Sequence, residues 1–255
     1  MSAHTLPVWN FAARTVVVTG AARGLGAAIA QAFLQAGAQV AALDQDGEVL
    51  AQRVAEWQAG TRCLAITVDV SAHDAVEAAL AQTVSHFGAL DGMVANAGIA
   101  RRGPALEIGV ADFDRVIEVN LNGLFYCNRL AARHMKPGGW IVNMASVMGF
   151  SGGIFPNAAY QASKGAVVNL TRALALEWAA QGLRVNGVAP AYVETPLTAP
   201  VLADPVKRAA VMAHAPLGRL PSPDDIAQAV LFLASDAAAS ITGQVLAVDS
   251  GYLAR

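Results

Sequence analysis

A tyrosine and a lysine one helical turn apart are the first candidates for chemistry in this chain. Tyr160 and Lys164 lie in the stretch YQASK, inside a segment of helical periodicity, so their side chains share one helix face. A free tyrosine has a pKa of about 10, and lowering it by about three units takes roughly 4 kcal/mol, which one cation about 4 Å away provides at an effective dielectric of about 20. The pair therefore indicates a phenol that a neighbouring ammonium makes usable as an acid or base near neutral pH. The alternative is that Tyr160 packs in a core while Lys164 extends to water.

Three further polar residues accompany this pair. Ser146 ends an apolar run at residues 140–146, and Asn96 ends another at 92–96. Asn120 lies inside the helical stretch VIEVNLNGLF, where asparagine has poor helix propensity. Serine and asparagine are also common turn residues. Together, however, these side chains are expected at one edge of a sheet.

A glycine-rich stretch, TGAARGLG at residues 19–26, follows the first apolar run and opens a helix. Gly20, Gly24 and Gly26 let the backbone turn sharply and approach a pyrophosphate, whose charge the amides and the helix N-terminus stabilise. A glycine-rich turn without a ligand is the alternative. The acid that a dinucleotide site also needs is present, because Asp44 ends the second apolar run, 24 residues after Gly20.

Asp44 and Arg23 favour different cofactors. The Asp44 carboxylate can accept hydrogen bonds from an adenosine ribose diol and would repel a 2′-phosphate, whereas Arg23, in the glycine loop, suits the extra phosphate of NADP. We expect Asp44 to decide, because a flexible arginine can turn to solvent or pair with Asp44 itself. The prediction is NAD, with NADP less favoured. The structural alternative is that Asp44 simply begins the polar turn DQDG.

Seven short apolar runs rich in β-branched residues alternate with segments of helical period, as in βαβ units. The predicted strands are residues 15–20, 39–44, 63–69, 92–96, 140–146, 184–190 and 244–249, and the predicted helices include 24–36, 72–87, 112–135, 158–181 and 223–235. The runs lack polar alternation, as in a parallel sheet buried on both faces. We therefore predict a single α/β domain over residues 1–255, with a Rossmann-like, doubly wound, seven-stranded parallel sheet and helices on both faces. Ligands are expected beyond the carboxyl ends of the strands.

The composition narrows the classes of function. The hydrophobic fraction is 55% and the formal net charge is -2, which gives no electrostatic reason to bind nucleic acid. No apolar run approaches the roughly 20 residues of a membrane helix, and the first ten residues lack a basic segment leading into an apolar one, which favours a cytoplasmic location without membrane partners. Cys63 and Cys127 form no CxxC motif and the five histidines form no close pair, so we expect buried free thiols and no metal site.

In these motifs the chain resembles the short-chain dehydrogenases/reductases over essentially its whole length. The matching segments run in order from TGAARGLG through ANAG (95–98), Asn120, Ser146 and YQASK to LFLASDAAASITGQVLAVDSG (231–251). The resemblance implies that Tyr160 is the general acid/base, that Ser146 holds the substrate oxygen, and that Lys164 lowers the pKa of Tyr160 and binds the nicotinamide ribose. It also implies that Asn120 anchors a water that relays protons to Lys164.

The resemblance further implies the cofactor contacts and the assembly. The cofactor residues are Gly20, Arg23, Gly24, Leu25, Gly26, Asp44, Asp69, Val70, Asn96, Ala97, Gly98, Tyr160, Lys164, Pro190, Val193 and Thr195. Among them, Asp69 and Val70 resemble the adenine contacts, and Val193 and Thr195 resemble the contacts to the nicotinamide carboxamide. The family is most often tetrameric and pairs the helices at 112–135 and 158–181 between subunits, so a homotetramer is expected.

Three departures from the family pattern affect this assignment. Ala191 follows the sixth strand where the family usually has glycine, so the loop backbone differs if φ is positive there. Ser146 precedes Tyr160 by 14 residues, one more than in many relatives, which leaves Ser151 as a second candidate. The sequence DSG at 249–251 replaces the common DGG. None of these changes removes a catalytic group.

Substrate selection is expected from the long excursion at residues 191–219, together with 148–157 and 98–106. The aromatic and polar candidates for this pocket are Phe150, Phe155, Glu194, Asn157, Arg101 and His214. The prolines and aliphatic residues of these segments predict a partly apolar pocket. Because Asp44 implies an oxidative bias, we expect a small secondary alcohol such as a polyol or sugar, or the matching ketone.

Two alternative functions remain open. Much of the C-terminal half also resembles 3-oxoacyl-(acyl-carrier-protein) reductases, which use NADPH. Those relatives commonly carry arginine where this chain has Leu176, and the loss of that basic contact argues against docking an acidic carrier. A noncatalytic dinucleotide-binding sensor would have the same fold, but the intact Asn120, Ser146, Tyr160 and Lys164 argue against it.

Overall fold

Seven parallel strands form one sheet in the order β3-β2-β1-β4-β5-β6-β7. The structure is a computed structural model that describes residues 9–254. The prediction that the first ten residues contain no targeting segment therefore falls mostly outside the described residues. The strands are β1 (Thr15–Thr19), β2 (Gln39–Asp44), β3 (Cys63–Thr67), β4 (Gly92–Ala95), β5 (Trp140–Met144), β6 (Arg184–Pro190) and β7 (Val245–Val248). Each lies within a predicted range, and the doubly wound α/β fold is confirmed. The strand order reverses between β1 and β4, which is where open sheets of this kind bind ligands.

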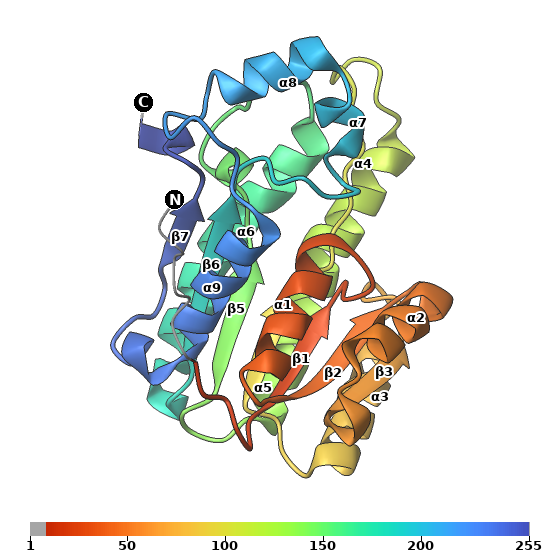
Figure 1. The fold of residues 1–255 in the computed structure, drawn as a ribbon, viewed down its shortest axis with the longest axis vertical. Helices are drawn as coiled ribbons and strands as arrows, with labels where there is room; N and C mark the ends of the chain where they lie inside the picture. The colour runs from red at the N-terminus through yellow and green to blue at the C-terminus, as the bar shows by residue number, and fades with distance from the viewer. Residues whose placement is uncertain (1–8, 255) are drawn as a thin grey trace.

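Helices cover both faces of the sheet because its strands are apolar on both sides. Along β1, Val16 and Val18 pack into one hydrophobic cluster and Val17 packs into the other. The first cluster includes residues of α1 (Gly24–Gln35), α2 (Gly47–Trp57) and α9 (Pro223–Ala234), and the second includes residues of α3 (His73–Phe87), α5 (Leu124–His134) and α6 (Ala158–Trp178). Figure 1 shows α1 and α9 in front of the sheet. Burial on both faces explains why the strand runs lack polar alternation.

The helix predicted over residues 112–135 contains a π-helical turn in the structure. α4 (Val110–Ile117) continues through a π-helical turn at Glu118–Gly123 into α5. A Cβ on Gly123 would lie 3.0 Å from the carbonyl oxygen of Val70, so glycine permits the close approach of the chain that follows β3. The predicted helix is therefore present as one continuous helical segment, and the π turn within it is a feature that the periodicity of the sequence does not predict.

Three helices fall outside the predicted ranges. α2 begins after Asp46, whose side chain accepts a hydrogen bond from the amide of Val49, while α7 (Ala199–Leu202) and α8 (Pro205–Met212) lie inside the excursion at 191–219. Residues of α7 and α8 form a third buried cluster with Tyr192, and Phe155 packs against it. Two of the three segments predicted to select substrate, 148–157 and 191–219, therefore pack together, and Figure 1 shows α7 and α8 above the carboxyl ends of the strands.

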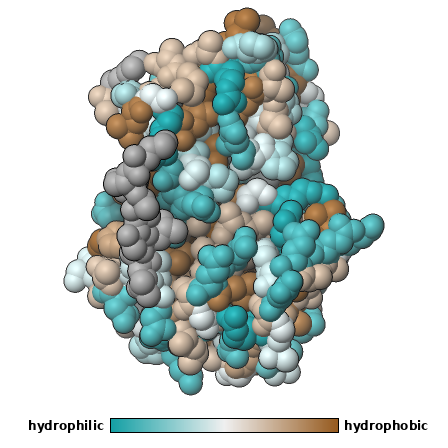
Figure 2. Space-filling model, viewed as in Figure 1, coloured by the Kyte–Doolittle hydropathy of each residue, from teal (hydrophilic) through white to brown (hydrophobic). Residues whose placement is uncertain are grey.

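The described residues also contain short 3-10 turns and two free cysteines. Single 3-10 turns occur at Gly60–Arg62, Val147–Gly149, Ala179–Gln181, Asp236–Ala238 and Tyr252–Ala254. Both cysteines are free; Cys127 is buried, which raises its pKa to about 12, and Cys63 is half-buried. No helix within residues 9–254 has the length and apolar character needed to cross a membrane. On the face drawn in Figure 2, hydrophilic and hydrophobic residues are interspersed.

Candidate active site

The glycine loop after β1 is built around close backbone contacts. Gly20 and Gly24 have positive φ values of 66° and 56°, which favour glycine. A Cβ on Gly26 would lie only 2.0 Å from the carbonyl oxygen of Gly20, so a side chain at this position would push α1 away from the turn. Arg23, at the N-cap of α1, makes no side-chain capping hydrogen bond. The first amides of α1 are therefore suited to bind an anion.

Asn96 holds the glycine turn in place from the neighbouring strand. Its Nδ2 donates hydrogen bonds to the carbonyl oxygens of Thr19 at 2.8 Å and Gly20 at 3.3 Å. The Thr19 hydroxyl accepts hydrogen bonds from the amides of Asn96 and Ala97, both at 3.0 Å. The ends of β1 and β4 are thus tied together. Thr19 was not among the predicted site residues, although its position directly before the glycine loop was the available signal.

A cleft of about 490 Å³ runs along the carboxyl ends of the strands, within the usual size range of small-molecule sites. The predicted cofactor residues that line it are Gly20, Arg23, Gly24, Leu25, Asp44, Asp69, Val70, Asn96, Ala97, Gly98 and Thr195. Gln45, Ile99, Arg101, Arg115 and Pro196 also line it and were not predicted as cofactor residues. The glycine cradle, the free helix N-terminus and the single carboxylate at the end of β2 together fit a dinucleotide.

The structure shows which acidic residue near the end of β2 forms an ion pair with Arg23. The Asp44 carboxylate accepts hydrogen bonds from the amides of Ala22 and Asp46, both at 3.0 Å. Arg23 pairs with Asp46, with 2.7 Å between Nη2 and Oδ2, rather than with Asp44. Hydrogen bonds from the Val49 amide and from Arg23 hold the pKa of Asp46 below its usual range. Among the arginines of residues 9–254, none pairs with Asp44.

Asp69 is also paired at the far end of the cleft. Its Oδ2 lies 2.8 Å from Nη2 of Arg115, which comes from α4 and also binds Glu118. Burial alone would raise the pKa of Asp69, but hydrogen bonds from Ser71 and Arg115 outweigh it and lower the pKa. Arg115 was not predicted, because its contact with Asp69 joins segments 46 residues apart.

Two smaller cavities bring the proposed catalytic residues together. A cavity of about 90 Å³ is lined by Ser146, Tyr160 and Lys164 and by the remaining predicted cofactor residues, Pro190 and Val193. It shares Leu25, Asn96, Gly98, Thr195 and Leu197 with the large cleft. A second cavity, of about 50 Å³, also touches Ser146 and Tyr160. Of all the predicted cofactor residues, Gly26 alone lines none of the three, because it lies beneath the turn.

Burial affects the pKa values of both Tyr160 and Lys164. Burial raises the pKa of Tyr160, while hydrogen bonding with the Ser146 hydroxyl and the charge of Arg102 act in the opposite direction. Lys164 is 3% exposed, and its Nζ donates a hydrogen bond to the carbonyl oxygen of Met144 at 2.6 Å. Burial lowers the pKa of Lys164 to about 8. In this geometry Lys164 Nζ lies 5.6 Å from the centre of the Tyr160 ring, and the lowering of the phenol pKa by Lys164 stays a prediction.

Asn120 makes hydrogen bonds with two segments that surround the site. It lies in the π turn, is fully buried, and both accepts a hydrogen bond from the Ile99 amide at 2.8 Å and donates one to the Ile99 carbonyl at 3.0 Å. Its Nδ2 also donates to the Ser163 hydroxyl at 3.1 Å. A Cβ on Gly98 would lie 3.2 Å from Asn120 Oδ1 and 3.7 Å from Lys164 Nζ. Asn120 therefore joins the loop after β4 to the helix that carries Tyr160 and Lys164.

The three departures from the family pattern have clear structural outcomes. Within residues 9–254, the non-glycine residues with positive φ are Ala13, Gln58 and Ser250, so Ala191 has an ordinary backbone conformation. Ser250, in the DSG sequence, has a φ of 54°, a left-handed conformation that favours glycine. Ser151 accepts a hydrogen bond from the Gly153 amide at 3.3 Å and lines neither small cavity, which leaves Ser146 as the serine of the site.

The predicted substrate contacts separate into two groups. Phe155 and Asn157 line the 50 Å³ cavity. Phe150 is 42% exposed, Glu194 pairs with Arg208 at 2.6 Å, His214 packs beside Tyr252, and Arg101 lines the large cleft and lies 3.3 Å from Asp112. The lining residues that were not predicted are Arg102, Met148, Tyr192, Leu197 and Thr198, with Ala191 from the loop.

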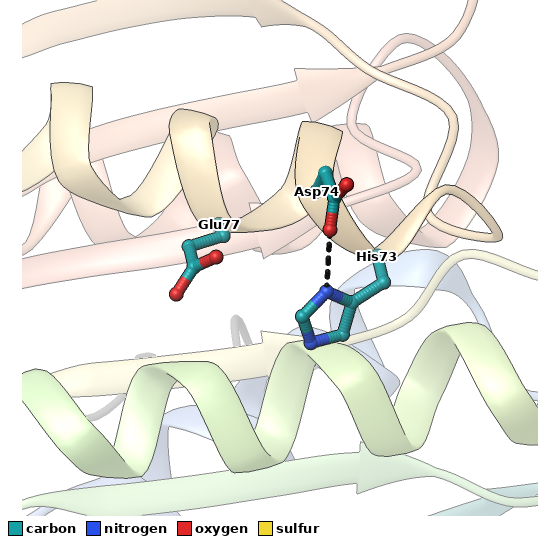
Figure 3. A group of neighbouring side chains, drawn as sticks. All are labelled: His73, Asp74 and Glu77. Carbon is teal, nitrogen blue, oxygen red and sulfur yellow. Dashed lines mark hydrogen bonds and ion pairs between the residues drawn. The ribbon is translucent and has the colours of Figure 1, made fainter.

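One group of potential metal ligands lies elsewhere. Within residues 9–254, His73, Asp74 and Glu77 bring their ligand atoms within 4.8 Å of one another. Figure 3 shows His73 and Asp74 pointing toward each other at the start of α3, with 2.9 Å between Nδ1 and Oδ1. The Asp74 side chain is fully exposed, and none of the three residues lines the cleft or the two cavities. An exposed group of this kind is not by itself an ion site.

Comparisons with known proteins agree with this geometry. A sequence profile for the family described as "Enoyl-(Acyl carrier protein) reductase" matches residues 20–253. The chain is 45% identical to the cis-4-hydroxycyclohexanecarboxylate dehydrogenase of Sinomonas cyclohexanicum over 96% of this chain and 98% of that protein. It is 36% identical to the 2-dehydro-3-deoxy-D-gluconate 5-dehydrogenase of Escherichia coli (strain K12) over 98% and 99% of the two chains.

A solved structure gives the same result. The crystal structure described as "Short-chain dehydrogenase/reductase SDR:Glucose/ribitol dehydrogenase" from Brucella melitensis superimposes with a TM-score of 0.92 at 38% identity. The match covers 96% of this chain and 99% of that one, so the whole fold is shared.

Proposed function

Because this chain belongs to the short-chain dehydrogenase/reductase family, we propose that it is an NAD-dependent oxidoreductase that interconverts a secondary alcohol and the corresponding ketone. The observation that carries this proposal is that Ser146, Tyr160 and Lys164 line one cavity that shares lining residues with the glycine-edged cleft. A substrate in this cavity would lie between groups that can move a proton and a cleft that fits a dinucleotide.

The proposed cofactor contacts follow the cleft. Gly20, Gly24 and the N-terminus of α1 would hold the pyrophosphate, and Asp44 would accept hydrogen bonds from the ribose diol. Asp69 and Val70 would contact the adenine, Lys164 the nicotinamide ribose, and Val193 and Thr195 the carboxamide. Two features favour NAD over NADP: the Asp44 carboxylate opposes a 2′-phosphate, and the Arg23 charge is already paired with Asp46.

The proposed mechanism assigns the proton to Tyr160 and the substrate oxygen to Ser146. In oxidation, the ionised Tyr160 takes the hydroxyl proton while the Ser146 hydroxyl donates a hydrogen bond to the same oxygen. In reduction, Tyr160 returns the proton. Lys164 would add positive charge near the phenol, and Asn120 would position the loop and helix around it. When bound beside Lys164, Val193 and Thr195, a nicotinamide would supply the hydride acceptor for oxidation and the hydride donor for reduction.

The substrate class is proposed from the size of the cavity and from the relatives. Ser146 and Tyr160 line a cavity of only about 50 Å³, which suits a small molecule. The names of the similar proteins refer to a hydroxylated ring acid, a sugar acid, and glucose or ribitol. We therefore propose a polyol, sugar or similar hydroxylated compound as the substrate. An acyl-carrier-protein substrate is disfavoured because Leu176, 82% exposed on α6, stands where a basic contact would be needed.

The first test is a turnover assay with purified protein. NAD or NADP is combined with a panel of polyols, sugars, sugar acids and cyclic secondary alcohols, and reduced nicotinamide is followed by absorbance. We expect turnover with at least one class and a higher kcat/KM for NAD than for NADP. Equal or better use of NADP would contradict the cofactor assignment. Turnover of ketoacyl thioesters with NADPH alone would favour the reductase, and tight NAD binding without turnover of any substrate would favour a sensor.

Replacing Tyr160 with phenylalanine tests the mechanism. We expect Tyr160→Phe to lower kcat by about three orders of magnitude or more, because the proton-transferring hydroxyl is removed while the ring remains. NAD affinity and thermal stability should stay close to those of the parent. Tyr126→Phe is the matched control, since Tyr126 lies on α5 and lines none of the three cavities, and it should keep full turnover. Substantial turnover by Tyr160→Phe would rule out Tyr160 as the acid/base.

A further inference from the structure

We propose that the small cavity beside Tyr160 and Ser146 selects secondary alcohols that also carry a carboxylate, and that Arg102 binds this carboxylate. The inference rests on the proposed dehydrogenase function and specifies its substrate class. It assigns a specificity role to a residue that the sequence motifs do not include.

The described lining of the 50 Å³ cavity carries a positive charge, that of Arg102. Among the described residues that line it, Arg102 is the only charged one, and none carries a carboxylate. Met148, Phe155 and Leu197 supply apolar surface next to the Ser146 and Tyr160 hydroxyls. The cavity therefore suits a molecule with a hydrocarbon body, a hydroxyl at one end and a negative charge at the other.

The charge of Arg102 has no acidic partner within residues 9–254. Its Nη2 donates a hydrogen bond to the Leu197 carbonyl oxygen at 2.9 Å, and no carboxylate pairs with it. Three arginines of the neighbouring cleft are each paired with an acid: Arg23 with Asp46, Arg101 with Asp112, and Arg115 with Asp69. A guanidinium has five N–H donors, so Arg102 retains donors for a bidentate carboxylate.

The backbone fixes Arg102 relative to the reacting hydroxyls. The next residue, Gly103, forms a parallel bridge with Asn157, and its amide donates a hydrogen bond to the Pro156 carbonyl at 3.4 Å. Asn157 directly precedes α6, which carries Tyr160. The charge of Arg102 also reaches the hydroxyl, because it is one of the groups that lower the pKa of Tyr160. The backbone next to Arg102 is thus tied to the start of α6, and Arg102 and Tyr160 line the same small, partly apolar cavity.

The test compares acids with their neutral amides. The substrates are two matched pairs, 4-hydroxycyclohexanecarboxylate with its primary amide and gluconate with gluconamide, each assayed with protein saturated in NAD. For at least one pair we expect kcat/KM to favour the acid at least tenfold, mainly through a lower KM. Arg102→Gln should bring this ratio close to one with little effect on KM for the amide, and Arg102→Lys should retain part of it. Because any effect of Arg102 on Tyr160 acts on acid and amide alike, the ratio isolates carboxylate recognition.

The control variant and a binding measurement separate the possible outcomes. Arg53→Gln removes an arginine of α2 that lines no cavity, and it should keep the parent ratio. Equal use of acid and amide by the parent, or an unchanged ratio in Arg102→Gln, would overturn the inference. If neither pair is turned over, calorimetric titration of the two acids decides the site, and the proposed function itself fails only if the whole panel of polyols, sugars, sugar acids and cyclic alcohols is also inactive with NAD and NADP. Acid binding that disappears in Arg102→Gln would support the inference, and binding equal in both proteins would overturn it.

Discussion

Lys164 holds a positive charge in a place where burial disfavours it. The side chain is 3% exposed, and burial lowers its pKa from 10.5 to about 8. Between these two values the unfolded chain binds one more proton than the folded chain, so the free energy of unfolding rises with pH across this window. Below about pH 8 the folded protein therefore bears the full cost of the buried charge. We interpret the destabilisation by the buried Lys164 charge as a requirement of the proposed function, in which Lys164 adds positive charge near Tyr160.

Lys164→Met is predicted to stabilise the protein while abolishing its activity. The pKa shift corresponds to about 3 kcal/mol, and the loss of the hydrogen bond to Met144 offsets about 1 to 2 kcal/mol of it. We therefore expect the free energy of unfolding at pH 7 to increase by about 1 to 2 kcal/mol. Urea unfolding at pH 7 and pH 10 measures this, and the gain should shrink at the higher pH. Lys164→Arg, which keeps the charge, should show no gain. A loss of stability in Lys164→Met at pH 7 would contradict this account.

Asp46 is predicted to contribute to the choice of cofactor through Arg23. The Arg23–Asp46 pair keeps the arginine charge from an incoming phosphate. Asp46→Asn removes the charge but retains a good N-cap residue for α2, so the helix should be preserved. We expect kcat/KM for NADP relative to NAD to rise about fivefold to tenfold, with NAD still preferred because Asp44 remains. The added substitution Arg23→Gln should cancel this gain, and an unchanged ratio in Asp46→Asn would show that Arg23 is not held back by Asp46.

At the scale of the elements, the sequence predicted what depends on local pattern. The seven apolar runs became the seven strands of one sheet, whose central strands β1, β4 and β5 are fully buried, and the glycine loop was recognisable because Gly20, Gly24 and Gly26 satisfy local backbone demands. The π turn at Glu118–Gly123 was not predicted, since it arises where Gly123 lets the helix approach the chain at Val70. Such an approach is a tertiary contact that no local periodicity encodes.

At the scale of the whole molecule, the sequence indicated the three segments that surround the substrate cavity, 98–106, 148–157 and 191–219, but not all of the individual residues that line it. Arg102, Met148 and Leu197 come from three separate segments and line one cavity. Arg101 and Arg102 are adjacent in the sequence, yet one pairs with Asp112 beside the large cleft and the other lines the substrate cavity without an acidic partner. Their types and spacing gave no basis for telling them apart, because the difference comes from the folded surroundings.

The expected homotetramer can be tested at the edge of the sheet. β7 is the last strand in the order, pairs only with β6 among the described strands, and exposes 40% of Leu246. An edge strand with an exposed apolar residue and no charge is available for pairing with another copy.

We expect the parent to have four times the subunit mass of 26.2 kDa by light scattering, and Leu246→Lys to form smaller species. Leu106→Lys changes a fully exposed loop leucine outside the sheet and should leave the tetramer intact. A tetramer that survives Leu246→Lys would exclude β7 from the contact, and a monomeric parent would show that the tetramer is wrong.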